Sequence, residues 1–324
     1  MLKRLGLDTF ILLLFTAIFL AWWNPAPGSS REPFSLSTLA TWGVSVIFFF
    51  YGLRLNWEKI RTGLADYRLH LVIQLATFLL FPLAVLPLVA YFGRLPDGSV
   101  DTLWLGVFFL AALPSTVSSS VVMVNLARGN VTAAIFNASI SSLLGVFLTP
   151  LWMQMWVSAA GGMPLSHVLF SLTLQVILPV TLGLCLHPFL GRISQKYDKS
   201  IRKCDQAIIL LIVYMSFCHS FGENMFAGFT LQKLLLLSAG MAALFFTIYA
   251  VVALACRLLR FPREDRITAL FCGSKKSLVH GTVMSQVLLA DARLAGVLLL
   301  PTMIYHAMQL IIVSIIARKM RGEV

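Results

Sequence analysis

The sequence predicts an all-α transmembrane protein of ten helices, arranged as two inverted five-helix repeats. Three observations support this prediction. Charged residues make up 12% of the 324 residues, against about 25% in soluble domains. The mean hydropathy is +0.87, and apolar runs long enough to span a bilayer recur along the whole chain. The net charge of +12 does not indicate nucleic-acid binding, because the basic residues lie between apolar runs rather than on one solvated face.

Each apolar run has the length of a spanning helix, which needs about 20 residues. The first run follows Lys3 and Arg4 as a signal peptide would, but it ends at Trp22 and Trp23 rather than at small residues. We therefore expect it to be retained as the first span. Connectors rich in Pro and Gly separate the runs. The predicted spans are 7–24, 36–54, 69–92, 102–125, 131–157, 165–190, 206–222, 231–255, 267–290 and 294–317.

The distribution of basic residues predicts the orientation of these spans. Of the 25 Lys and Arg residues, nineteen fall on the side that carries the N-terminus, four on the other side and two within a span. Cytoplasmic loops carry the excess of Lys and Arg, so both termini are expected in the cytoplasm of a bacterial inner-membrane protein. Five spans per half place the second half upside down, which is typical of inverted-repeat transporters. The predicted repeats are residues 1–160 and 161–324.

The fourth and ninth spans each carry a helix breaker followed by hydroxyl side chains, at matched positions in the two halves. Pro114 interrupts the fourth span and Gly273 the ninth. Two interrupted helices at corresponding positions are a strong sequence indication of a midplane binding site, although small residues also line ordinary helix interfaces. The candidates are Ser115, Thr116, Ser118, Ser119 and Ser120 in the fourth span and Ser274, Lys275, Lys276, Ser277 and His280 in the ninth.

Lys275 and Lys276 give this site its predicted charge. If the ninth span begins near Ile267, the lysines lie about 12–14 Å deep at 1.5 Å per residue; the alternative is that they are solvated near the cytoplasmic end. A charge at the bilayer centre costs about 2.5–3.5 kcal/mol on insertion scales. No carboxylate falls at the predicted midplane, so we expect the site to favour an anion. Adjacent helical residues diverge, which leaves open which lysine faces the site.

Enzymatic chemistry is not indicated. The sequence contains no Walker loop, no HExxH motif and no Ser/His/Asp arrangement, and its five cysteines have no metal-ligand spacing. We predict no enzyme activity, no catalytic residue and no cofactor.

Several motifs together resemble the bile acid:sodium symporter superfamily, over essentially the whole chain. The resemblance is to its orphan symporter-like branch, which includes bacterial proteins and the seventh, orphan member of the animal bile-acid carrier family. The motifs are Phe50–Leu55, Leu69–Gln74, Leu113–Ser119, Gly129-Asn130, Ala134–Asn137, Leu148–Pro150 and Lys276-Ser277.

The resemblance implies a panel domain and a core domain, with the fourth and ninth helices unwound and crossing. It also implies two sodium ions near the crossing. Gln74 matches a glutamine ligand of sodium, Ser118 and Ser119 fall at a Ser-Asn pair, and Asn137 and Ser139 lie in the stretch that completes the first ion site. Sodium could accordingly be held by Gln74, Ser118, Ser119 and Asn137.

The ninth helix departs from this pattern. Phe271 or Cys272 falls where the bile-acid members carry a sodium-binding Glu, and Lys275 and Lys276 replace the following Gln and Asn. An ammonium would repel a sodium ion, or replace it as a fixed cation, so sodium coupling is doubtful. The predicted function is secondary transport of a small or amphipathic organic anion by alternating access. The alternative is a non-transporting regulatory membrane protein with the same fold. The expected partners are the anionic substrate and the lipid bilayer, with no nucleic acid.

Overall fold

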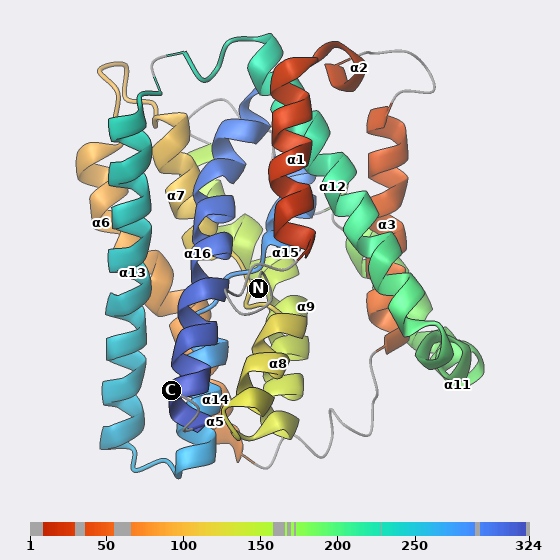
Figure 1. The fold of residues 1–324 in the computed structure, drawn as a ribbon, viewed down its shortest axis with the longest axis vertical. Helices are drawn as coiled ribbons and strands as arrows, with labels where there is room; N and C mark the ends of the chain where they lie inside the picture. The colour runs from red at the N-terminus through yellow and green to blue at the C-terminus, as the bar shows by residue number, and fades with distance from the viewer. Residues whose placement is uncertain are drawn as a thin grey trace.

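The computed structural model describes residues 9–29, 36–54, 66–157, 166, 170–171, 173–227, 229–288 and 292–321. The described residues are helical throughout, apart from connectors and one isolated antiparallel bridge between Arg94 and Val100 (Figure 1). The all-α class predicted from composition is thereby confirmed.

The helices follow the predicted apolar runs. The fourth and ninth predicted runs are each divided by a non-helical segment. The third predicted run contains a π-helical turn, η3. In chain order the elements are α1 (Thr9–Trp23), α2 (Ala26–Ser29), α3 (Leu36–Arg54), α5 (Tyr67–Leu75), η3 (Ala76–Leu80), α6 (Phe81–Phe92), α7 (Thr102–Ala112), α8 (Ser118–Leu126), α9 (Val131–Val157), η5 (Thr173–Ile177), α11 (Leu178–Lys196), α12 (Asp198–Gly222), α13 (Leu231–Leu258), α14 (Arg263–Gly273), α15 (Leu278–Leu288), η6 (Ala292–Leu294) and α16 (Ala295–Arg321).

Six helical segments among the described residues are long and apolar enough to cross a membrane, which supports a multi-pass membrane protein. Helices α1, α3 and α7 contribute shorter apolar segments. The total of ten crossings remains a prediction. The six segments are Tyr67–Phe92, Val131–Trp156, Thr173–Lys196, Asp198–Gly222, Leu231–Leu258 and Ala295–Arg321.

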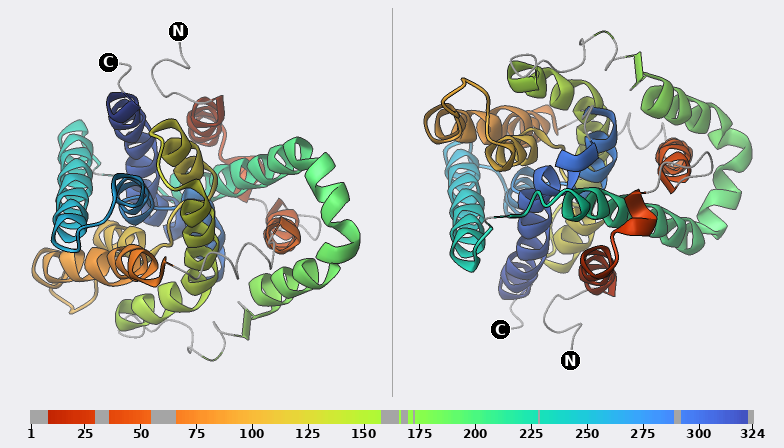
Figure 2. Two further views of the ribbon diagram at one scale, coloured as in Figure 1. Left: turned by 90° about the horizontal axis from the view of Figure 1, so that it is seen from below. Right: turned by 90° about the horizontal axis from the view of Figure 1, so that it is seen from above.

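Helices α1, α3, α11 and α12 lie on one side of the molecule; we call them the four-helix group. Figure 2 shows α11 and α12 curving around α3. Glycines bring α3 and α11 together: a Cβ on Gly52 would lie 2.1 Å from the Val180 carbonyl oxygen, and one on Gly183 would lie 2.2 Å from that of Phe49. The two backbones therefore touch without intervening side chains.

Apart from the short α2, which packs against α12, the remaining helices form a larger group whose interior is built around α7, α14 and α16. Phe108, Phe271 and Tyr305, one from each of these helices, are among the largest fully buried side chains. The larger group contacts the four-helix group mainly where α12 meets α15, η6 and α16. Ser220 on α12 donates to the Arg293 carbonyl and accepts from the Gly296 N–H at 3.0 Å.

We expect Gly52→Ala to destabilise the protein, because the added methyl group would force the α3 and α11 backbones apart. Overpacking of this kind costs about 1–3 kcal/mol, which should lower the thermal unfolding midpoint of the purified protein. Gly240→Ala on α13 is the control, since no atom lies within 4 Å of its Cβ position. If both variants melted like the wild type, the close approach of α3 and α11 would be wrong.

Candidate functional site

The two interrupted spans cross each other at their non-helical segments. α7 ends at Ala112 and α8 begins at Ser118, while α14 ends at Gly273 and α15 begins at Leu278. The Ser277 N–H donates to the Pro114 carbonyl at 2.9 Å, and the Ser115 hydroxyl donates to the Cys272 carbonyl at 2.6 Å. Each broken segment thus supplies hydrogen-bond partners for the other.

Lys276 lies at the centre of this crossing and is fully buried. Its ammonium donates to the carbonyl oxygens of Thr77, Ala111 and Leu113, each at 2.7 Å. An ammonium has three N–H donors, so all three are used. The ammonium also lies 4.1 Å from the centroid of the Phe81 ring, a favourable cation–π distance.

The sequence explains why the Thr77 carbonyl is free to accept from Lys276. In an α-helix it would accept from the Phe81 N–H, but that group donates to Ala76 across the π-helical turn. In the π-helical pattern the Thr77 carbonyl would accept from the N–H of residue 82, but this residue is Pro82, which has no N–H.

The Ala111 carbonyl is released in a similar way. Its normal helical donor, the Ser115 N–H, donates instead to the Ser141 hydroxyl at 3.0 Å. The Leu113 carbonyl lies just beyond the end of α7, where the helix dipole is negative. A buried cation at this position satisfies backbone groups that lipid could not.

Helix α16 completes the unwound segment before α15. Gln309 accepts from the Lys276 N–H at 2.9 Å and donates to its carbonyl at 2.8 Å. The Tyr305 hydroxyl donates to the Ser274 carbonyl at 2.7 Å, and the Ser274 hydroxyl donates to Leu270 at 2.6 Å. The sequence analysis did not select Gln309, although it is a polar residue in the middle of an apolar run and lies one turn beyond Tyr305.

Lys275 is equally buried but has a different environment. Its ammonium donates to the Ser119 hydroxyl at 2.8 Å, and Ser119 donates to Thr116 at 2.9 Å. Thr116 and Ser120 share a hydrogen bond of 2.7 Å. These hydroxyls surround the first turn of α8. Within the described residues neither lysine forms an ion pair, and Lys275 makes one hydrogen bond with its ammonium. The side chain of Ser118 lies outside the described part of the structure.

Gln74 and Asn137 form a second polar cluster, between α5 and α9. Gln74 donates its amide N–H to the carbonyl and side-chain oxygens of Asn137, both at 3.2 Å. The Asn137 amide lies 2.7 Å from His70 Nδ1 and donates to Ala133 at 2.9 Å. His70 is a member of this cluster that the sequence analysis did not select. The Ser139 hydroxyl donates to Ile135, and the Ser139 carbonyl accepts from Tyr51 of α3 at 3.0 Å.

His280 lies where the two helix groups meet. Its Nδ1 is 2.9 Å from the Ser277 hydroxyl, and its buried Nε2 has no protein partner among the described residues. The ring packs edge-on against Phe48 and Tyr51 of α3, with centroids 5.8 and 6.4 Å away. His280 therefore contacts residues of both helix groups.

The crossing fits a bound sodium ion poorly. Three carbonyl oxygens that could ligate a cation already accept from the Lys276 ammonium. The Gln74 amide nitrogen donates to Asn137, while the buried Gln74 Oε1 has no protein partner among the described residues. Among the described residues, no group of three or more His, Cys, Asp or Glu side chains could hold another metal ion.

Replacing Lys276 with Met should strongly destabilise the protein. The change removes the donors of three buried carbonyls, and each unsatisfied group costs about 1–3 kcal/mol. Lys275→Met should lower the free energy of unfolding less, because the Ser119 hydroxyl would lose Lys275 but still donate to Thr116. Thermal unfolding of the two purified variants measures the difference. Equal unfolding midpoints would show that Lys276 does not hold the crossing together.

Comparisons with known proteins identify the family of this chain. The model of the SBF-like CPA transporter family matches residues 8–322. An uncharacterised protein of Pseudomonas aeruginosa is 36% identical over 96% of this chain and 92% of its own length. The Escherichia coli protein named "Putative symporter YfeH" is 35% identical, over 98% of this chain and 94% of its own length. Sodium/bile acid cotransporter 7 of Xenopus tropicalis is 26% identical, over 98% and 92% respectively. This chain belongs to the SBF-like CPA transporter family.

Proposed function

We propose that this protein is a secondary transporter that moves a small or amphipathic organic anion by alternating access. The observation that carries the proposal is the buried Lys275 ammonium, which has hydroxyl neighbours and no carboxylate partner among the described residues. Lys276 uses its three donors on the backbone. Lys275 has two N–H donors to spare, and they can recognise a carboxylate or a similar anionic group.

The first turn of α8 adds to the positive potential around Lys275. The N-terminus of a helix carries a partial positive charge and free N–H groups. Ser119 lies in that turn and bonds to Lys275, while Thr116 and Ser120 extend the hydroxyl network. Hydroxyls can donate or accept, so they can reorganise when an anion binds. In this proposal Lys275 is the charged ligand and the hydroxyls orient the substrate.

We further propose that the four-helix group is the panel of an inverted-repeat transporter and that the larger group is its core. The support is their limited contact, most of which lies at the C-terminal end of α12 around Ser216 and Ser220. Phe48 and Tyr51 of α3 make further contacts with His280 and Ser139. The predicted orientation places that end on the periplasmic side.

The proposal does not include sodium coupling, although some relatives are named for sodium and bile acid. In this proposal Lys276 supplies the donors for the carbonyl groups at the crossing, so these groups have no need of an inorganic ion. In this scheme the fold is held by Lys276 and the substrate by Lys275.

A screen of organic anions by thermal unfolding tests the proposed function. A ligand at 100 times its dissociation constant stabilises a protein by about 2.7 kcal/mol. We expect at least one carboxylate to raise the unfolding midpoint saturably and to enter proteoliposomes, and Lys275→Met to lose both effects. Lys233→Met is the matched control, because Lys233 is exposed on α13.

Two results would contradict the proposal. The first is anion binding and uptake that persist unchanged in Lys275→Met. The second is a saturable midpoint shift with sodium chloride that potassium chloride does not give, because sodium is not part of the proposed site. Binding without uptake would favour the regulatory alternative over transport.

A further inference from the structure

The corner where α11 meets α12 is strongly basic. Figure 2 shows it at the outer edge of the four-helix group, away from the larger group. Between residues 187 and 222 the only acidic residues are Asp198 and Asp205. The basic residues of the corner are Arg192, Lys196, Lys199, Arg202 and Lys203.

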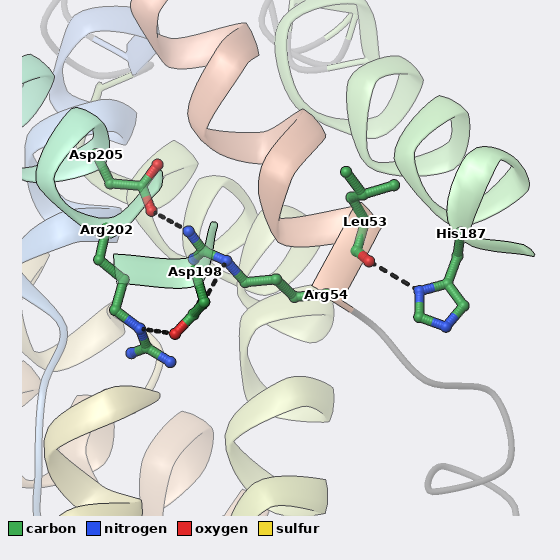
Figure 3. Close-up of polar contacts among 6 residues, drawn as sticks. All are labelled: Leu53, Arg54, His187, Asp198, Arg202 and Asp205. Carbon is green, nitrogen blue, oxygen red and sulfur yellow. Dashed lines mark hydrogen bonds and ion pairs between the residues drawn. The ribbon is translucent and has the colours of Figure 1, made fainter. Parts of the chain in front are cut away.

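Both acidic side chains are already engaged (Figure 3). Asp205 accepts from Arg54 of α3 at 2.8 Å. Asp198 lies 3.5 Å from the Arg54 Nε and accepts from Arg202 at 2.7 Å. Arg54 thus ties the end of α3 to α12 and draws both carboxylates to itself and to Arg202. Among the described residues, little negative charge remains for the other cations of the corner.

Four cations are left without an acidic partner among the described residues. Arg192 and Lys196 are four residues apart on α11, and Lys199 and Lys203 are four apart on α12, so each pair shares a helix face. All four are exposed. The Lys196 ammonium lies 5.5 Å from the centroid of the Tyr197 ring. We call these four exposed cations, which lie on either side of the junction between α11 and α12, the basic corner.

An apolar stripe on α11 leads directly to the basic corner. Leu186, Phe189, Ile193 and Tyr197 recur at helical spacing, and Phe189 is 78% exposed. In a membrane protein such side chains contact hydrocarbon. Tyr197 lies at the end of the stripe beside Lys196, as aromatic residues do at the level of lipid headgroups. Apolar side chains and cations are thus stacked along one short section of helix.

We propose that the basic corner binds an anionic phospholipid of the cytoplasmic leaflet. Its phosphate would lie among Arg192, Lys196, Lys199 and Lys203, and an acyl chain would follow Phe189 and Ile193. Charge complementarity selects the headgroup, and the apolar stripe selects a lipid over a soluble phosphate. The site is separate from Lys275 and does not depend on transport.

Lipid binding to the full-length protein in neutral detergent tests this site without any transport assay. Native mass spectrometry would measure the affinity for phosphatidylglycerol and for phosphatidylcholine. Each Lys near an anionic lipid surface contributes about 1 kcal/mol, or roughly fivefold in binding. We therefore expect Lys199→Gln/Lys203→Gln to bind phosphatidylglycerol about 25-fold more weakly. Affinity for phosphatidylcholine should not change.

The control is Arg257→Gln/Arg260→Gln, which removes the same charge at the exposed end of α13 and should bind phosphatidylglycerol like the wild type. Lipid-free unfolding midpoints of both double variants should match the wild type, since all four side chains are exposed. Equal losses in the two double variants, or none in either, would overturn the proposal. Binding of glycerol 3-phosphate as tightly as the lipid would also overturn it, because the apolar stripe would then contribute nothing.

Discussion

Three backbone carbonyl oxygens converge on the Lys276 ammonium, and the crossing of the interrupted helices depends on this contact. A helix that stops inside a membrane leaves carbonyl groups without donors, and lipid supplies none. Pro82 and the diverted Ser115 amide create such groups on two separate segments. One lysine from a third segment donates to these carbonyls, so the Lys276 side chain joins three parts of the chain.

This use of Lys276 determines what the neighbouring lysine can do. Because Lys276 alone donates to the three carbonyl groups, Lys275 keeps spare N–H donors beside the hydroxyls of Ser119 and Thr116. Two adjacent residues in an unwound segment thus have separate roles, one toward the backbone and one toward a proposed ligand. His280 connects this site to α3 through Phe48 and Tyr51, so a change at the crossing can alter the contact between the helix groups.

The sequence allowed the helical class, the apolar runs and both interruptions to be predicted, because Pro114 and Gly273 break an otherwise apolar pattern. The carbonyl groups that accept from Lys276 could not be predicted from the sequence, because every residue has a carbonyl and only the three-dimensional fold brings Thr77 and Ala111 together. The π-helical turn that frees Thr77 has no clear sequence pattern apart from Pro82. Gln309 and His70 became recognisable only through their partners, Lys276 and Asn137.

Chemical rescue tests the role of the Lys276 ammonium most directly. In Lys276→Ala the side chain is removed and the carbonyls of Thr77, Ala111 and Leu113 are left without their donor. We predict that this variant unfolds at a lower temperature than the wild type, and that propylammonium raises its unfolding midpoint saturably while leaving that of the wild type unchanged. A Lys276→Ala variant that melts like the wild type, or that propylammonium fails to stabilise, would contradict it.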